Sequence, residues 1–376
     1  MLKAGKTSGL WDSWRSDRIL LVTLATCVIF SREGEEYYAK LANPLVLGLT
    51  FFWLFGVILV SSFAVVRHAE HIAERLGEPA GTLILTLSVT FIEVMSITAI
   101  MLHGENNPTL VRDTILSVIM IVLNGMVGLS LLLGGWKHRE QVYNLQGANT
   151  YLGVIIPLVV LSVILPDYTE TTPGPALSVL QQSALSFMSL GLYCAFLAMQ
   201  TGRHRAYFTL DEGLMEKAHV APAPGARSVP FHFVMLAAYV LPVIYLAEQL
   251  AHPIDYVIET LKAPDIFGGV AIALLVATPE AVGAVRAALA NKLQRSVNIL
   301  LGSVLSSIGL TVPVMLIVSR WTAHPVVLGV EHADMILLLL TLALSFITFS
   351  NGRTNVLQGA VHLIMFTTFL FLMMEG

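Results

Sequence analysis

Residues 81–93 read GTLILTLSVTFIE, and residues 268–280 read GGVAIALLVATPE. Each stretch begins with glycine, continues through eleven uncharged residues and ends on a glutamate, Glu93 or Glu280. The interval from Glu93 to Glu280 is the same as the interval from Gly81 to Gly268. Apolar runs of this kind form membrane-spanning helices, and a constant separation between similar segments indicates an internal repeat. The two stretches therefore predict a membrane protein built from two related halves.

The composition of the whole chain agrees with this prediction. Of its 376 residues 56% are hydrophobic and only 12% are charged, whereas soluble domains carry about 25% charged residues. This excludes an ordinary soluble enzyme and a disordered protein, and the net charge of −4 offers no basic field for nucleic acid. The two cysteines, Cys27 and Cys194, exclude a disulfide scaffold and a cysteine-rich metal site. We therefore expect an all-α polytopic membrane protein whose partner is the lipid bilayer.

Eleven segments are apolar enough to span a bilayer. The first is short and resembles a signal peptide, but no small-residue cleavage site follows Phe30, so we keep it as a span. The predicted spans are 18–31, 43–66, 82–103, 111–134, 148–165, 174–200, 230–250, 266–289, 296–319, 332–350 and 354–374.

The basic residues predict the orientation of these spans. Eleven spans place sixteen of the 21 Lys and Arg residues on one side of the membrane and five on the other. Because basic loops stay in the cytoplasm, we expect a cytoplasmic N-terminus and an external C-terminus.

The eleven predicted spans also indicate how the chain divides into repeats. We expect an N-terminal segment with an extra helix (1–40), a five-helix repeat (41–200), a cytoplasmic linker (201–229) and a second five-helix repeat (230–376). Two five-helix copies joined by one loop have opposite orientations, as in many secondary transporters. The interval recurs, shorter by a single position, between Ser117 and Ser303. A rival match, LQGA at 145–148 and 357–360, falls on one side of the membrane in both copies, so we interpret it as chance.

Glu93 and Glu280 are the candidate transport site. Glu93 lies eleven residues inside its span, about 16 Å deep, and ionisable groups near the bilayer midplane indicate function. Two carboxylates across a pseudo-twofold axis can bind Ca²⁺, which requires six to eight oxygen ligands. We expect further oxygens from the hydroxyls of Thr90, Thr278 and Ser88, and from backbone freed by Pro279, although each hydroxyl could instead bond to its own helix.

The same pair predicts coupling between cations and protons. Burial and mutual repulsion disfavour two ionised carboxylates, so protons would replace a departing cation. Competition for one site is the minimum requirement of an antiporter. The transported Ca²⁺, Na⁺ or K⁺ and H⁺ are then substrates, and we expect no cofactor and no enzymatic activity.

Other polar residues within the spans are candidates for an auxiliary path. Each has a structural alternative: ion pairing with Arg112 for Asp113, helix packing for the Ser and Asn residues, a hydrogen-bonded core role for the histidine, and helix capping for Glu78. The candidates are Ser117, Asn124, Asn298, Ser303, Glu78, Asp113 and His362, with Ser306 and Ser307 on the same predicted side of their span.

Two other functions remain open. A cation channel would also place carboxylates in the membrane, but paired binding residues in an inverted repeat favour alternating access. An intramembrane metal-dependent enzyme is suggested by His68-Ala-Glu-His71, which does not match the zinc-binding H-E-x-x-H pattern. The sequence leaves open whether the chain forms a homo-oligomer.

At these residues the chain resembles the Ca²⁺/cation antiporter superfamily and, within its cation/proton exchanger branch, the bacterial Cha-type Ca²⁺(Na⁺,K⁺)/H⁺ antiporters. The resembling stretches cover most of the membrane region. They are Val66-Arg-His-Ala-Glu70, Leu76-Gly-Glu-Pro79, Leu87-Ser-Val89, Ile92-Glu-Val94, Pro108-Thr-Leu-Val-Arg-Asp-Thr114, Ser130-Leu-Leu-Leu-Gly-Gly135, Thr278-Pro-Glu280, Gly302-Ser-Val-Leu305, Leu310-Thr-Val-Pro-Val314 and Phe349-Ser-Asn-Gly-Arg-Thr-Asn-Val356.

The resemblance implies a ten-helix inverted repeat with an extra first helix, a central site at Glu93 and Glu280, and proton-driven cation export across the bacterial inner membrane. The chain also departs from the pattern Gly-Asn-x-x-Glu of the wider family. Here Val89-Thr90 and Val276-Ala277 stand where the family has Gly-Asn. Because the asparagine oxygens are missing, exchange of Na⁺ or K⁺ becomes more plausible than strict Ca²⁺ selectivity.

Overall fold

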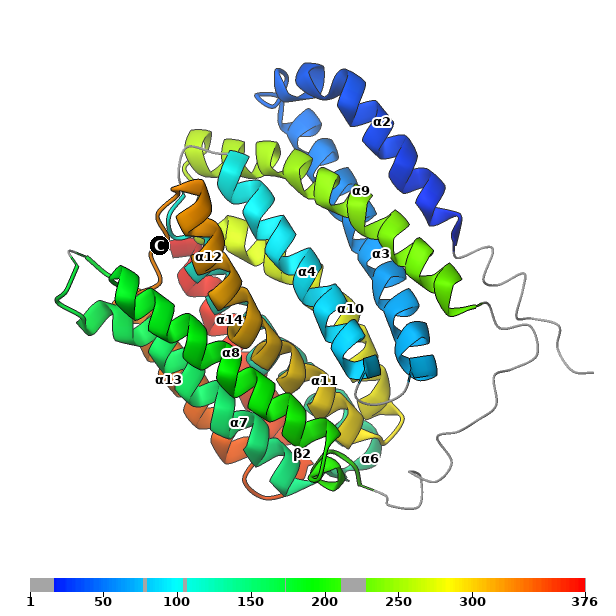
Figure 1. The fold of residues 1–376 in the computed structure, drawn as a ribbon, viewed down its shortest axis with the longest axis vertical. Helices are drawn as coiled ribbons and strands as arrows, with labels where there is room; N and C mark the ends of the chain where they lie inside the picture. The colour runs from blue at the N-terminus through cyan, green and yellow to red at the C-terminus, as the bar shows by residue number, and fades with distance from the viewer. Residues whose placement is uncertain (1–16, 77–79, 104–106, 173, 211–227, 376) are drawn as a thin grey trace, which may run out of the picture. The chain divides into compact units, whose positions relative to one another are not determined.

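A computed structural model describes residues 17–76, 80–103, 107–172, 174–210 and 228–375. Within these residues the chain forms eleven long helical runs, and each overlaps one of the predicted spans (Figure 1). Nine of the runs described are long and apolar enough to cross a membrane. The other two are α2 (Ile19–Tyr38), whose second half is charged, and α13 (His332–Thr348), which has 17 residues. The predicted all-α polytopic fold is confirmed.

The remaining runs include four that combine α-helix with π-helical turns. In chain order they are α3 (Pro44–Leu76), α4 (Ala80–His103), α5–η1–α6 (Leu110–Ile119, Met120–Met126, Val127–His138), α7–η2–η3 (Leu145–Val159, Val160–Ile164, Leu165–Tyr168), α8 (Val179–Thr201), α9–η6 (Val229–Asp255, Tyr256–Thr260), α10 (Ile266–Leu289), α11–η7–α12 (Leu293–Ser306, Ser307–Thr311, Val312–Thr322) and α14 (Val356–Glu375).

Several helices are longer than the sequence predicts. The runs expected to end at residues 31, 66 and 250 continue to Tyr38, Leu76 and Thr260. An apolar count stops at the first charged residues, whereas the helix continues because Glu, Lys and Arg are good helix formers.

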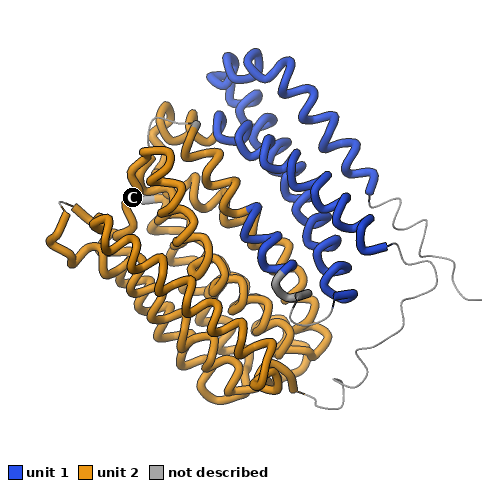
Figure 2. The backbone as a smooth tube through the Cα atoms, viewed as in Figure 1, with its two compact units in different colours: residues 1–92, 211–253 blue, residues 93–210, 254–376 orange. Residues whose placement is uncertain are grey.

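The structure divides into two compact units, each of which is described by itself. Unit 1 contains residues 1–92 and 211–253, and unit 2 contains residues 93–210 and 254–376 (Figure 2). The division cuts α4 between Ile92 and Glu93, whereas α10 lies wholly in unit 2. The repeat boundaries inferred from the sequence are a different partition and stay a prediction. Much of the predicted linker, residues 211–227, lies outside the described residues.

In unit 1, polar contacts join the helices within their apolar surroundings. Thr23 of α2 and Ser61 of α3 share a hydrogen bond of 2.8 Å. The buried rings of His68 on α3 and His232 on α9 are joined by a hydrogen bond of 2.9 Å between their Nδ1 atoms. Such contacts matter in a membrane, where a buried polar group without a partner is costly.

Unit 2 contains a small two-stranded sheet. One strand lies in the chain between α6 and α7, and the other lies between α13 and α14. Strand β1 (Glu140–Val142) pairs antiparallel with β2 (Arg353–Asn355), with Gln141 opposite Thr354. These strands lead into α7 and α14, so both LQGA segments begin helices next to one sheet. This agrees with their predicted placement on one side of the membrane. α10 packs against α5 and α6, and α14 packs against α6.

Two π-helices occupy matching positions in the predicted repeats. η1 begins at Met120 and η7 begins at Ser307, and the interval between these two positions is the interval from Glu93 to Glu280. π-helical turns are rare and often mark functional sites. The matched interruptions support the predicted duplication with an observation that is independent of the repeated residues.

Large apolar side chains cover much of the outer surface. Leu180, Phe187 and Trp321 are each at least 80% exposed. An apolar surface of this kind marks a membrane or partner contact, and here it is the expected lipid-facing surface.

Candidate functional site

The two predicted carboxylates lie near the middle of equally long helices. Glu93 is on α4 and Glu280 is on α10, and each helix has 24 residues. Both glutamates belong to unit 2. The Glu93 side chain is buried, and the two carboxyl groups lie close enough for their charges to interact. The structure therefore brings together the two residues that the repeat predicts to form one site.

Hydroxyl groups from one helical run lie beside the two carboxyl groups. Ser307 Oγ, at the start of η7, donates a hydrogen bond of 2.9 Å to Glu93 Oε2. Thr311, at the end of η7, also lies beside Glu93, and Ser303 of α11 lies beside Glu280. Neither carboxyl group has a basic partner among the described residues. The site can therefore accept positive charge, as a cation or as protons.

Several oxygen atoms at this site have no well-formed hydrogen bond in the described part of the chain. They are Glu93 Oε1, Glu280 Oε2 and Thr311 Oγ1. In that part of the chain, no three His, Cys, Asp or Glu residues gather as a metal site. A cation held by the two carboxylates would therefore draw its remaining ligands from hydroxyls, backbone carbonyls and water, which suits the hard cations Ca²⁺, Na⁺ and K⁺.

The threonine and serine ligands predicted on the glutamate helices differ in their hydrogen bonds. Ser88 donates to Ile84 O at 2.7 Å, and Thr278 donates to Leu274 O at 2.5 Å, so both bond to their own helix. Thr90 is buried on α4 before Glu93, and its Oγ1 has no partner within the described residues. Of these three hydroxyls, that of Thr90 is the one left available for a ligand.

Pro279, expected to free backbone for a cation, lies inside a continuous helix, and that role stays a prediction. α10 runs without interruption from Ile266 to Leu289 with Pro279 inside it. A proline removes one hydrogen bond but need not break a helix whose other groups are satisfied by packing. The irregular backbone lies instead in η1 and η7 of the neighbouring runs.

Asn124 and His362 belong to a separate buried polar cluster. Asn124 Nδ2 donates to Thr341 Oγ1 at 2.7 Å, and His362 Nδ1 lies 3.3 Å from Asn124 Oδ1. The other ring nitrogen of His362 lies 2.9 Å from Thr348 Oγ1. Both nitrogens are thus engaged, as in a structural histidine, and a role in proton transfer stays a prediction.

The other candidates lie apart from this cluster. Asn298 Nδ2 donates to Phe208 O at 2.8 Å, which ties α11 to the first part of the predicted linker. The buried Ser117 hydroxyl has no partner among the described residues. Glu78 lies outside the described residues.

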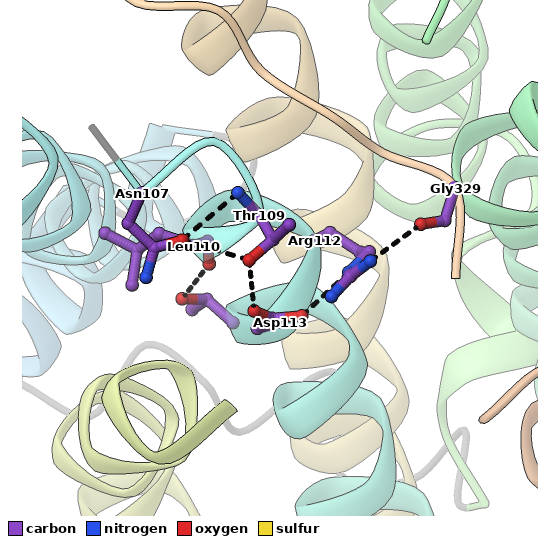
Figure 3. A network of polar contacts seen from close by, with 7 residues as sticks. Asn107, Thr109, Leu110, Arg112, Asp113 and Gly329 are labelled. Atoms are coloured by element: carbon purple, nitrogen blue, oxygen red, sulfur yellow. Dashed lines mark hydrogen bonds and ion pairs between the residues drawn. The ribbon is translucent and has the colours of Figure 1, made fainter. Parts of the chain in front are cut away.

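Asp113 is the centre of a polar network at the start of α5 (Figure 3). Arg112 Nε and Thr109 Oγ1 each donate to its carboxylate at 2.8 Å. Arg112 also donates to Gly329 O at 3.1 Å, and Asn107 accepts from Thr109 (Figure 3). The carboxylate is therefore paired with Arg112, and the network joins α5 to the segment before α13.

Two residues of the site are not evident as site candidates in the sequence. Ser307 stands out only as part of a polar side of its span, and Thr311 does not stand out at all. The repeat could have pointed to Thr311. It lies opposite Asn124, which the sequence does single out, because the two are separated by the same interval as Glu93 and Glu280. The π-helical register that points these hydroxyls toward Glu93 is not visible in the sequence.

The sequence matches a known protein family along most of its length. The family described as sodium/calcium exchanger protein matches residues 46–202 and 231–375. The chain belongs to this family. The relatives named below are described as antiporters, an exchanger or an ionic transporter, so the protein is a transporter and not an enzyme.

Individual relatives narrow the comparison. The sodium-potassium/proton antiporter ChaA of Escherichia coli is 39% identical over 355 residues, 94% of each chain. The putative ionic transporter y4hA of Sinorhizobium fredii is 41% identical over 84% of this chain and 86% of its own. The Ca²⁺/H⁺ antiporter ChaA of Bacillus subtilis is 25% identical over 82% of this chain and 88% of its own. These relatives confirm the predicted resemblance to Cha-type cation/proton antiporters.

Solved structures share the fold. The structure of native YfkE superposes with a TM-score of 0.72 over 95% of this chain and all of that chain, at 20% sequence identity. The sodium-calcium exchanger NCX_Mj superposes with a TM-score of 0.53 over 87% of this chain and 98% of its own, at 18% identity.

Proposed function

We propose that this protein exports Na⁺, K⁺ and Ca²⁺ in exchange for protons by alternating access, with Glu93 and Glu280 as the shared binding site. The observation that carries the proposal is the juxtaposition of two carboxyl groups without a basic partner among the described residues. A cation and protons can each neutralise this pair, but not at the same time. Competition for one site converts a proton gradient into cation export.

The choice of cations rests on two observations. The family's asparagine is replaced by Thr90 and Ala277 in the two halves. Both amide oxygens are lost and only the Thr90 hydroxyl takes the place of one, which lowers the number of oxygen ligands available to Ca²⁺. The Escherichia coli relative, at 39% identity, is named for sodium and potassium. Both observations support monovalent transport beside Ca²⁺.

The orientation follows from the basic residues. Sixteen of the 21 Lys and Arg residues fall on the side that we assign to the cytoplasm, in agreement with the positive-inside rule. We assign the protein to the bacterial inner membrane, with the N-terminus in the cytoplasm and the C-terminus in the periplasm.

Everted membrane vesicles test the function. After an imposed pH gradient acidifies the lumen, addition of Na⁺, K⁺ or Ca²⁺ should collapse the gradient, followed with a pH-sensitive dye. Glu93→Gln and Glu280→Gln should each abolish the response, since a neutral amide cannot alternate between cation and proton. Glu36→Gln is the matched control, because Glu36 is exposed and pairs with Lys40.

The results of this assay distinguish the proposed exchange from its alternatives. If either glutamate variant exchanged cations normally, a shared site at Glu93 and Glu280 would be wrong. Cation flux that leaves the pH gradient untouched would indicate a channel. The same assay, run cation by cation, ranks the substrates.

A further inference from the structure

The first part of the predicted linker packs onto helices of unit 2. After α8 the chain forms the short turn η4 (Arg205–Phe208). The ring of Phe208 is buried, and it packs edge-on against Tyr151 of α7 and Phe196 of α8, whose ring centroids lie 5.5 and 5.6 Å away. Buried aromatic rings in this arrangement fix a chain segment through a large apolar contact. We refer to residues 205–209 as the linker anchor.

The backbone of the linker anchor is bound by amide side chains from two helices. Asn144 Nδ2, at the start of α7, donates to Ala206 O and Thr209 O at 3.2 and 3.3 Å. Asn298 Nδ2, on α11, donates to Phe208 O at 2.8 Å. A short turn satisfies few of its own carbonyl groups, so these side chains supply the missing donors. The segment that leaves α8 is therefore tied to both α7 and α11.

Gln294 joins these amide groups into one network. Its Oε1 accepts a hydrogen bond from Asn144 N at 2.6 Å, and its Nε2 donates to Asn298 Oδ1 at 2.8 Å. Gln294 is buried, with 6% of the residue exposed. Gln294 and Asn298 thus each use both the oxygen and the nitrogen of the amide. Because a buried polar network with an unsatisfied member is costly, removal of one side chain should disturb the others.

The network holds one face of the helical run that supplies hydroxyl groups to the site. Gln294 and Asn298 are four residues apart on α11 and so share a face. Ser303 lies beside Glu280, and Ser307 donates to Glu93. Ser303 and Ser307 follow Asn298 by five and nine residues, which places them about 140° and 180° around the helix. The network therefore holds the rear of α11, and the two hydroxyls lie on the opposite face.

We propose that the linker anchor and Asn298 are positioning elements for the cation site, which keep Ser303 and Ser307 turned toward the carboxyl groups. A hydrogen bond weakens steeply when its angle is lost, so a hydroxyl contributes to the site only while it points at its partner. A helix held at its rear face cannot rotate about its axis without breaking the network. The inference rests on the proposed exchange function and adds to it a control of cation affinity from outside the site.

Asn298→Ala in proteoliposomes tests the inference. The variant loses the hydrogen bonds to Phe208 and Gln294 and keeps the aromatic cluster. We expect the KM for the transported cation to rise about fivefold, the equivalent of one weakened hydrogen bond at the site, with little change in the maximal rate per molecule of protein. Gln146→Ala is the control, because Gln146 is exposed on α7. A merely structural role would lower the maximal rate and leave KM unchanged, and that result overturns the proposal.

A double-mutant cycle shows whether Asn298 acts through a serine of the site. In a Ser307→Ala background, Asn298→Ala should raise KM by a smaller factor than in the parent, because one of the hydroxyls that it positions is gone. Equal factors in the two backgrounds would mean that Asn298 acts independently of Ser307, and the proposal would be wrong.

Thermal unfolding in detergent provides a measurement that does not need transport. A cation that binds the folded state raises the Tm by an amount that depends on its affinity. At a sub-saturating concentration of Na⁺ or Ca²⁺, this rise should be smaller in Asn298→Ala and Phe208→Ala than in the parent. Leu210→Ala should match the parent, because Leu210 is 50% exposed and lies beyond the linker anchor. Equal rises in all of these proteins overturn the proposal. A parent that is stabilised by cations but does not exchange them for protons would count against the proposed function instead.

Discussion

At the scale of single residues, the two glutamates differ in their hydroxyl neighbours. Glu93 has Ser307 and Thr311, whereas Glu280 has Ser303. A serine hydroxyl donates to a carboxylate, accepts from a carboxylic acid and can offer lone pairs to a cation. A serine hydroxyl can therefore stay bonded at the site whether the carboxyl group is ionised, protonated or bound to a cation.

Ser307→Ala tests the importance of this hydroxyl. The variant loses the 2.9 Å hydrogen bond to Glu93, a loss of about 1 kcal/mol, and we expect the KM for the cation to rise roughly fivefold. Initial rates of cation-dependent proton movement in proteoliposomes measure this effect. Ser306→Ala is the control, because Ser306 bonds to the backbone of Ser303. Equal effects of the two substitutions would contradict a specific role for Ser307.

At the scale of elements, close helix packing depends on individual glycines. α10 contains Gly269, where an added Cβ would lie 2.5 Å from the backbone of Asp113 on α5, and Gly283, where an added Cβ would meet only Ile299, at 3.8 Å. The same helix therefore provides one glycine that packing requires and one that it does not.

Gly269→Ala should destabilise the protein by about 1–3 kcal/mol, because the added methyl group overpacks the contact with Asp113. Gly283→Ala should be neutral or slightly stabilising, since alanine favours a helix over glycine. Thermal unfolding of the purified proteins in detergent measures both. A similar Tm for the two variants would show that the contact with α5 tolerates a side chain.

At the scale of the whole molecule, the proposed shared site would link cation affinity to pH. Deprotonated carboxylates bind the cation, so cation binding releases protons. As the pH falls, protons occupy the site more often. We expect the KM for the cation to rise, by up to about tenfold per pH unit for each proton displaced, and saturating cation to restore the maximal rate. Measurements at several pH values test this, and a falling maximal rate at constant KM would indicate separate sites.

Some features of this molecule can be read from local sequence. The apolar runs locate the membrane helices, because spanning a bilayer requires a minimum length of apolar residues. The common separation of Gly81–Gly268 and Glu93–Glu280 identifies the paired carboxylates. By contrast, apolar counts end α3 at residue 66 rather than Leu76, because helix formation continues beyond the apolar region.

The sequence by itself thus determined the membrane fold and predicted the repeat and the two glutamates of the proposed site, since hydrophobicity and spacing are properties of the chain. Only the tertiary structure decided which hydroxyls face those glutamates, that Asn124 bonds Thr341 and His362, and that Asn298 bonds the backbone of Phe208. These contacts join residues that are far apart in the chain. Their geometry depends on π-helical register and on the packing of helices whose side chains are mostly apolar, and neither is encoded in a local pattern.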